Sequence, residues 1–191
     1  MQTVSNPLNQ VTTYSPDCNT GLVLSVTDPN QLTTTYTYDS MWRLATATYP
    51  NGEVDSITHQ ETTPPFTATL TRTITSSQNY IKTNQFDGLG RLSQTELVSD
   101  PENPIYTATV YDPLGRVGTV YNLTRCNPPT TNCGTEPTWG YTTYTYDALN
   151  RKTLVTEPDT STISTSYTGG CTTVTDEAGK NRQSCTDGLA A

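Results

Sequence analysis

The chain has 191 residues, a hydrophobic fraction of 32%, a mean hydropathy of -0.56 and a formal net charge of -8 at pH 7. Its 10 lysine and arginine residues do not cluster. This excludes the basic stripe that binding to nucleic acid requires, and it disfavours an anionic membrane surface. No apolar run approaches the roughly 18 residues that cross a bilayer, so we expect no membrane span.

The N-terminus lacks the basic and apolar stretches of a signal peptide, because Met1 is followed by Gln2-Thr3-Val4-Ser5. We interpret the chain as a piece of a longer protein and residues 1–21 as a lead-in. Threonine is the commonest residue and there are 12 tyrosines, both types that favour strands and that disordered chains lack. The composition therefore predicts an all-β chain.

Alternation of threonine with tyrosine or another strand-forming residue appears in residues 34–38, 107–111 and 144–146, each of which leads into a copy of a short motif. This period of two is typical of strands that place tyrosine on one face and threonine on the other. The motif is an aromatic residue, Asp, two variable residues, Gly or Asn, and Arg. Its members are Tyr38, Asp39, Arg43; Phe86, Asp87, Gly90, Arg91; Tyr111, Asp112, Gly115, Arg116; and Tyr146, Asp147, Asn150, Arg151.

Each motif predicts a tight turn between two strands. The Asp carboxylate accepts hydrogen bonds from backbone N–H groups further along the turn, and Pro113 stands where type I turns favour proline. Gly or Asn three residues after the Asp permits a positive φ, as in a three-residue hairpin loop with a bulge. In the first copy Trp42 replaces Gly or Asn, so we expect that turn to be strained or built differently. A weaker copy spans 175–180 and a truncated one begins at Thr186.

Turn signals recur at intervals of about 11 to 13 residues over most of the chain, which is typical of all-β proteins. The spacing predicts strands of about seven residues and roughly twelve to fourteen of them in one antiparallel meander. Two stretches interrupt it: a polar link from His59 to Pro65, and an insert at 123–139. We expect both to be loops on one rim of the array, with no domain boundary.

Five cysteines are present, and two pairs are placed to form disulfides. Cys126 and Cys133 bracket a short loop, and Cys171 and Cys185 flank a predicted turn, so that each pair is able to close a bridge. The polar, threonine-rich background suits a secreted, oxidised protein. Cys18 is then left without a partner in the chain, and five free thiols is the alternative.

Other chemistry finds little support. The turn aspartates are about a dozen residues apart and serve as turn caps, so they do not converge on calcium. His59 is the sole histidine and lies in a polar link, and the spacing of Cys126 and Cys133 does not fit zinc. We expect no catalytic residue, no cofactor and no metal. Trp42, Trp139 and the tyrosine rows either stack on sugars or pack between repeats, and we favour packing.

The motif Tyr-Asp-x-x-Gly-Arg-Leu resembles the YD repeat of the Rhs family, which includes bacterial toxins, insecticidal toxin complexes and teneurins. The resemblance covers residues 22–189, with half-repeats at 26–28 and 174–176. It implies tandem antiparallel β-hairpins in one long curved sheet, a segment of the spiral shell that encloses a toxic domain in some members. It also implies secretion and no catalysis by the repeats. The chain shows no match to the self-cleaving core that some members carry.

The resemblance further implies that the motif tyrosines and Phe86 stack along the sheet and that the aspartates fix the turns. The arginines would reach a carboxylate of a neighbouring hairpin or stack on its aromatic ring. The predicted function is a scaffold or shell-wall segment of an extracellular or cell-surface bacterial protein. Its expected partners are the rest of a larger repeat polypeptide or copies of itself, and an enclosed cargo domain. The alternatives are an extracellular binding module for carbohydrate or protein, and a filament subunit assembled through open sheet edges.

Overall fold

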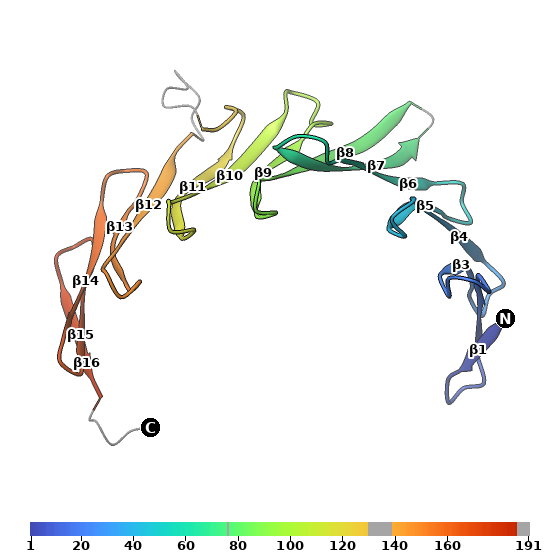
Figure 1. Cartoon of the computed structure of the whole chain (residues 1–191), viewed down its shortest axis with the longest axis horizontal. Coiled ribbons are helices and arrows are strands. Elements are labelled where there is room, and N and C mark those ends of the chain that lie inside the picture. The colour runs from blue at the N-terminus through green and yellow to red at the C-terminus, as the bar shows by residue number, and fades with distance from the viewer. Residues whose placement is uncertain (76, 130–138, 187–191) are drawn as a thin grey trace. The chain divides into compact units, whose positions relative to one another are not determined.

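The computed structural model describes residues 1–75, 77–129 and 139–186, which form one open antiparallel sheet of sixteen strands (Figure 1). The strands follow one another in chain order, β1 to β16, so that every connection joins neighbours. The predicted all-β meander is confirmed, but the expected twelve to fourteen strands were too few. The strands are shorter than expected, mostly five to seven residues, and a hairpin lies inside the lead-in.

The strands fall into two compact units, formed by residues 1–91 with 96–103 and by residues 92–95 with 104–191. The first unit contains β1 (Gln2–Ser5), β2 (Val11–Pro16), β3 (Val23–Thr27), β4 (Thr33–Tyr38), β5 (Leu44–Thr48), β6 (Val54–Gln60), β7 (Phe66–Thr75) and β8 (Gln78–Phe86). β9 (Leu92–Leu97) is divided between the units. The second contains β10 (Ile105–Tyr111), β11 (Val117–Thr124), β12 (Tyr141–Tyr146), β13 (Lys152–Thr156), β14 (Thr162–Thr168), β15 (Cys171–Thr175) and β16 (Asn181–Cys185).

One five-residue loop recurs throughout the described part of the sheet. Its first residue donates its N–H to the carbonyl of the fifth, and the fourth donates to the carbonyl of the first. The fourth residue always has a positive φ, between 58° and 84°. This is a type I turn followed by a left-handed residue, which suits the twist of a hairpin. The loops are 6–10, 28–32, 39–43, 49–53, 87–91, 112–116, 147–151, 157–161 and 176–180.

Trp42 leaves the first motif turn in the same form as the other copies, so of the two expected outcomes the structure shows a strained turn and not a differently built one. It adopts φ 64°, and the 39–43 loop keeps both backbone hydrogen bonds of the other copies. A left-handed conformation costs a residue with a Cβ roughly 1–2 kcal/mol. The cooperative pairing of the flanking strands therefore imposes the left-handed conformation even on a bulky side chain.

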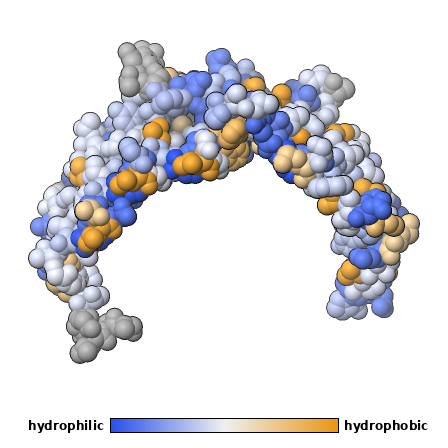
Figure 2. Space-filling view, in the orientation of Figure 1, coloured by the Kyte–Doolittle hydropathy of each residue, from blue (hydrophilic) through white to orange (hydrophobic). Residues whose placement is uncertain are grey.

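The sheet has almost no buried core. The buried apolar residues are Ala47, Ala108 and Tyr121, at 4%, 7% and 7% exposure, and no helix or second sheet covers the described strands. Cross-strand threonine pairs contribute instead: the Oγ1 atoms of Thr37 and Thr46 are 2.6 Å apart, for example. Figure 2 shows hydrophobic residues scattered in small patches over the visible face. A single layer of this kind explains the low hydropathy of the chain.

The expected interruptions lie elsewhere than predicted. The β1–β2 hairpin occupies the lead-in, and His59 belongs to β6, so the polar link starts after Gln60. The link joins β6 to β7 in the first compact unit, and the insert follows β11 in the second. Their placement on one rim stays a prediction. Most of the insert, residues 130–138, lies outside the described residues, and the division at residue 22 stays a prediction.

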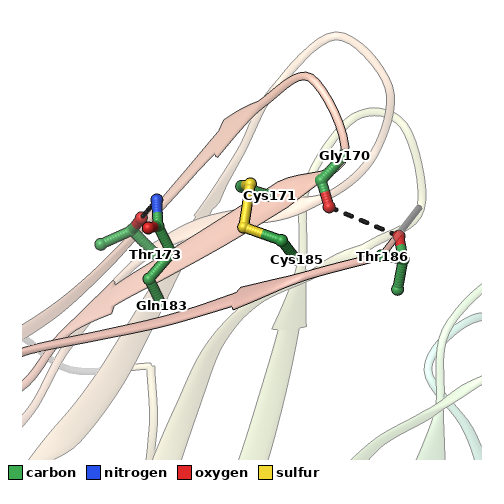
Figure 3. Close-up of a disulfide and its surroundings, with 6 residues drawn as sticks. All are labelled: Gly170, Cys171, Thr173, Gln183, Cys185 and Thr186. Carbon is green, nitrogen blue, oxygen red and sulfur yellow. Dashed lines mark hydrogen bonds between the residues drawn. A yellow bond between two sulfur atoms is a disulfide. The ribbon is translucent and has the colours of Figure 1, made fainter.

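A disulfide joins the last two strands (Figure 3). Cys171 and Cys185 are directly opposite partners in β15 and β16, with Cα atoms 4.0 Å apart. Beside them Thr186 donates its N–H to the Gly170 carbonyl at 2.9 Å, and the Gln183 side chain donates to Thr173 Oγ1 at 3.1 Å. These contacts hold β16, all of whose residues are exposed.

The other cysteines divide into two cases. Cys126 is disulfide-bonded, but its predicted partner Cys133 lies outside the described residues, so that pairing stays a prediction. Cys18 is a free, exposed thiol within the β2–β3 connection.

Replacing both Cys171 and Cys185 with serine should free β16 locally. The bridge closes a loop with a sequence separation of 14, and a loop of this size is worth about 3 kcal/mol of chain entropy. We expect amide hydrogen exchange in β16 to accelerate strongly while β4 to β6 keep their protection. Cys18→Ser is the matched control and should change amide exchange neither in β16 nor in β4 to β6. Unchanged exchange in β16 would show that the hydrogen bonds suffice without the disulfide.

Candidate functional site

Within each compact unit the motif turns lie on one edge of the meander. They connect β4 to β5, β8 to β9, β10 to β11 and β12 to β13, so each follows an even-numbered strand. We call this the motif edge. The weaker copy at 175–180 connects β15 to β16 and so lies on the opposite edge. The truncated copy lies mostly outside the described residues, which end at Thr186.

An Asp–Arg clasp closes each motif turn. In the first copy Asp39 Oδ1 accepts the backbone N–H groups of Met41 and Arg43, both at 2.9 Å, and Oδ2 accepts Arg43 Nε at 2.8 Å. The same three bonds, at 2.7–2.9 Å, recur in the turns that begin at Asp87, Asp112 and Asp147. The aspartates thus cap the turns. The resemblance did not imply the arginine contact, since it paired each Arg with a neighbouring hairpin only.

Hydrogen bonds to the charged form lower the pKa of each clasp carboxyl. The largest effect on the pKa comes from the backbone N–H of Arg43 at Asp39, from the side chain of Arg91 at Asp87 and from the backbone N–H of Arg151 at Asp147. At Asp112 burial acts to raise the pKa, but the bonds from Arg116 outweigh it and the pKa is again lowered. Each clasp is therefore complete while its carboxyl is ionised.

Acidification should open these clasps. A carboxyl whose pKa is lowered on folding stabilises the fold above its unfolded pKa, near 3.8, and loses that contribution as pH falls through the lowered value. We expect the urea midpoint to be steady from pH 7 to pH 5 and to fall below pH 4. A variant in which Asn replaces the aspartates at positions 39, 87, 112 and 147 should have a lower urea midpoint at pH 7. That midpoint should also change less with pH than the midpoint of the parent. Glu177→Gln should behave like the parent. Equal slopes in the parent and the fourfold variant would contradict the clasp.

The motif tyrosines tie each hairpin to the one before it. The hydroxyl of Tyr38 donates to the Val23 carbonyl at 2.8 Å, and that of Tyr146 donates to the Val117 carbonyl at 2.9 Å. Tyr111 and Tyr167 make the same bond to Leu92 and Lys152, at 3.0 Å each. Every acceptor is the first residue of the preceding strand, just past its turn. These hydroxyl-to-carbonyl bonds link neighbouring strands, and Phe86 lacks the hydroxyl to form one. The stacking of the motif rings along the sheet stays a prediction.

Removing one of these hydroxyls should loosen the contact between two hairpins. Tyr146→Phe deletes the partly buried hydrogen bond to the Val117 carbonyl, at a cost of about 1 kcal/mol. The measurement is chemical denaturation of parent and variant. Tyr144→Phe is the matched control on the same strand, since the Tyr144 ring contacts the Lys152 ammonium at 4.2 Å through its face. Equal losses in both variants would assign the effect to general packing.

The arginines also reach toward the next hairpin, in addition to their own aspartates. The Arg116 Cζ lies 4.6 Å from the centre of the Tyr146 ring, and its Nη1 donates to Asn150 Oδ1 at 2.9 Å. Arg151 lies in the same way over Tyr167, at 4.1 Å. Arg43 pairs with Glu61 of the β6–β7 loop. Each of these arginines therefore joins its own turn to its neighbour, which fixes their mutual register.

Sequence reasoning missed a further ion pair, which joins β6 to β7. Asp55 and Arg72 are directly opposite in β6 and β7, and Arg72 donates Nε and Nη2 to the two carboxylate oxygens at 2.7 and 2.6 Å. Tyr49 adds its hydroxyl at 3.1 Å. The Arg72 bonds hold the pKa of Asp55 low, and the carboxylate raises that of Arg72. The partners are 17 residues apart, so only the strand register reveals them.

The remaining candidates do not form a reactive centre. His59 Nδ1 is 4.0 Å from Asp39 Oδ2, beside the Arg43 clasp. Trp139 packs edge-on against Tyr141, while Trp42 is 62% exposed. Across 1–75, 77–129 and 139–186, no three His, Cys, Asp or Glu side chains gather as metal ligands. In the same part of the chain, no helix is long and apolar enough to cross a membrane.

Comparison with known proteins agrees with the repeat motif. Residues 19–54 match the family model described as RHS Repeat, which confirms the resemblance drawn from the YD motifs. No curated protein matches the chain. The crystal structure of TcdB2-TccC3 is similar over 92% of this chain, with a TM-score of 0.68 and 14% identity, and shares its fold. That of TcdB2-TccC3-TEV has a TM-score of 0.47 and 12% identity over the same share. This chain spans only 12% and 16% of those two chains.

Proposed function

Because residues 19–54 match the RHS Repeat model and the YD motif recurs further along the chain, we propose that it is a structural wall segment of a larger repeat polypeptide that is secreted or displayed on a bacterial surface. The observation that carries the proposal is the open sheet, in which each strand contacts its sequence neighbours and almost nothing is buried. Such a sheet provides an extended surface. The wall role needs no catalytic residue, cofactor or metal.

The two outermost strands support a continuation of the sheet. β1 pairs only with β2 and β16 only with β15 in the described residues, and both strands are exposed throughout. β1 carries no charged side chain, and charges are the usual protection of an open edge. Further repeats of the same polypeptide would satisfy these edges. A cargo domain enclosed by the complete wall is the partner that this role would serve.

The test is the mass of the purified chain by light scattering across a concentration series. Unsatisfied edges should pair between copies, so we expect the mass to rise above 20.8 kDa with concentration. Val4→Lys together with Ser184→Lys adds charge to both edges and should hold the chain at the monomer mass. Thr12→Lys with Thr165→Lys places the same charges on interior strands and serves as control.

The outcomes separate the candidate functions. A mass that stays at 20.8 kDa, with slow amide exchange along both β1 and β16, would mean that the edges are already closed, which contradicts the wall segment. Unlimited growth into fibres would favour the filament subunit that uses the same edges. An extracellular binding module is the other alternative, and the exposed Trp42 is the observation in its favour.

A further inference from the structure

A surface hollow of about 480 Å³ lies beside the first motif turn. The β2–β3 connection contributes Asp17 and Asn19, and β4 with its turn contributes Tyr36, Tyr38 and Trp42. All of these residues belong to the first compact unit. The hollow therefore combines three aromatic rings with polar groups from two connections on the motif edge.

The rings are held in place by the fold. Tyr36 and Tyr38 alternate with threonines in β4 and lie on one face of the sheet, and the Tyr38 hydroxyl is anchored on the Val23 carbonyl. Trp42 keeps a left-handed backbone, which four of the equivalent turns assign to glycine, and its side chain is 62% exposed. A costly conformation that presents a large apolar ring to solvent is a feature typical of binding residues.

The charges around the hollow are negative. Asp17 and Asp39 line it together with neutral residues, and neither Lys nor Arg is among the lining residues. Asp17 Oδ1 accepts bonds of 2.8–3.0 Å from two N–H groups and the Thr20 hydroxyl, all neutral donors that leave its charge uncompensated. Asp39 shares Arg43 with Glu61, so these three side chains together carry one negative charge. An anion would be repelled here, whereas a cation gains a Coulomb attraction to the carboxylates that a neutral ligand, limited to hydrogen bonds with them, does not gain.

We propose that this hollow binds an organic cation, with the ammonium group against the aromatic rings and the Asp17 carboxylate. Aromatic faces attract ammonium groups through the ring quadrupole, and indole is the strongest of the side chains in this respect. A neighbouring carboxylate adds Coulomb attraction that salt screens. A quaternary ammonium headgroup and the side chain of a lysine share this chemistry. The inference is independent of the wall role, which depends on the sheet edges.

Ligand-observed NMR titration of the full chain tests the proposal with three probes. Choline is the quaternary ammonium probe, N-acetyl-lysine methylamide represents a lysine side chain, and 3,3-dimethylbutan-1-ol is the neutral isostere of choline. We expect a cation to bind at least about five-fold more tightly than the isostere. Raising the salt concentration should weaken the binding of the cation and leave the binding of the isostere unchanged. The stronger of the two cations identifies the source of the ligand.

Two variants locate the site without threatening the fold. Trp42→Gly removes the indole and places at φ 64° the residue that suits this conformation best, so the variant should be at least as stable as the parent. Asp17→Asn keeps an oxygen for the turn bonds and removes the charge. Each should weaken cation binding by about five-fold or more. Thr160→Gly makes the change at the same position of the 157–161 turn and should leave binding unaltered.

Three results would overturn the proposal. The first is the absence of saturable binding of either cation up to about 100 mM. The second is binding of the neutral isostere, or of a neutral disaccharide, as tight as that of the cation, which would assign the hollow to uncharged ligands. The third is cation binding that survives both Trp42→Gly and Asp17→Asn. None of these results bears on the light-scattering test, so failure of the two proposals is distinguishable.

Discussion

The architecture depends on the five-residue turn in which a left-handed fourth residue reverses the chain. The geometry recurs nine times in the described residues, with φ between 58° and 84° at that position. A type I turn with a left-handed residue matches the twist of paired strands, so each turn returns the chain beside the strand it has just left. Repeating this local event builds a sheet in chain order without any crossover.

Such a sheet distributes its stability between neighbours instead of concentrating it in a core. Ala47, Ala108 and Tyr121 are the buried apolar side chains, too few to hold sixteen strands together. The tyrosine hydroxyl that reaches the preceding strand and the arginine that joins its own turn to the next provide the linkage between hairpins. Stability in this arrangement is approximately a sum of repeat and interface contributions, which permits extension at either end. That property suits a wall.

The first motif turn differs from the others in a way that the wall does not require. Glycine or asparagine at position 42 would build the same loop without strain, yet the chain has an exposed tryptophan there, beside Tyr36, Tyr38 and Asp17. The structural role of the turn is carried by the Asp39 carboxylate and the backbone bonds. The side chain of Trp42 is therefore available for recognition, and a repeat scaffold gains a binding surface by varying one loop position.

Turn chemistry and strand alternation are local properties, and for this reason the sequence by itself determined the all-β class, the hairpin tips at Asp39, Asp87, Asp112 and Asp147, and the facing of Cys171 and Cys185. It missed the β1–β2 hairpin, whose Asn6 loop lacks the motif. Only the tertiary structure decided contacts between strands: the Asp55–Arg72 pair, the Tyr146 bond to Val117 and the hollow beside Trp42. These depend on register and on which strand lies alongside, and a shift of one residue would turn every side chain to the other face.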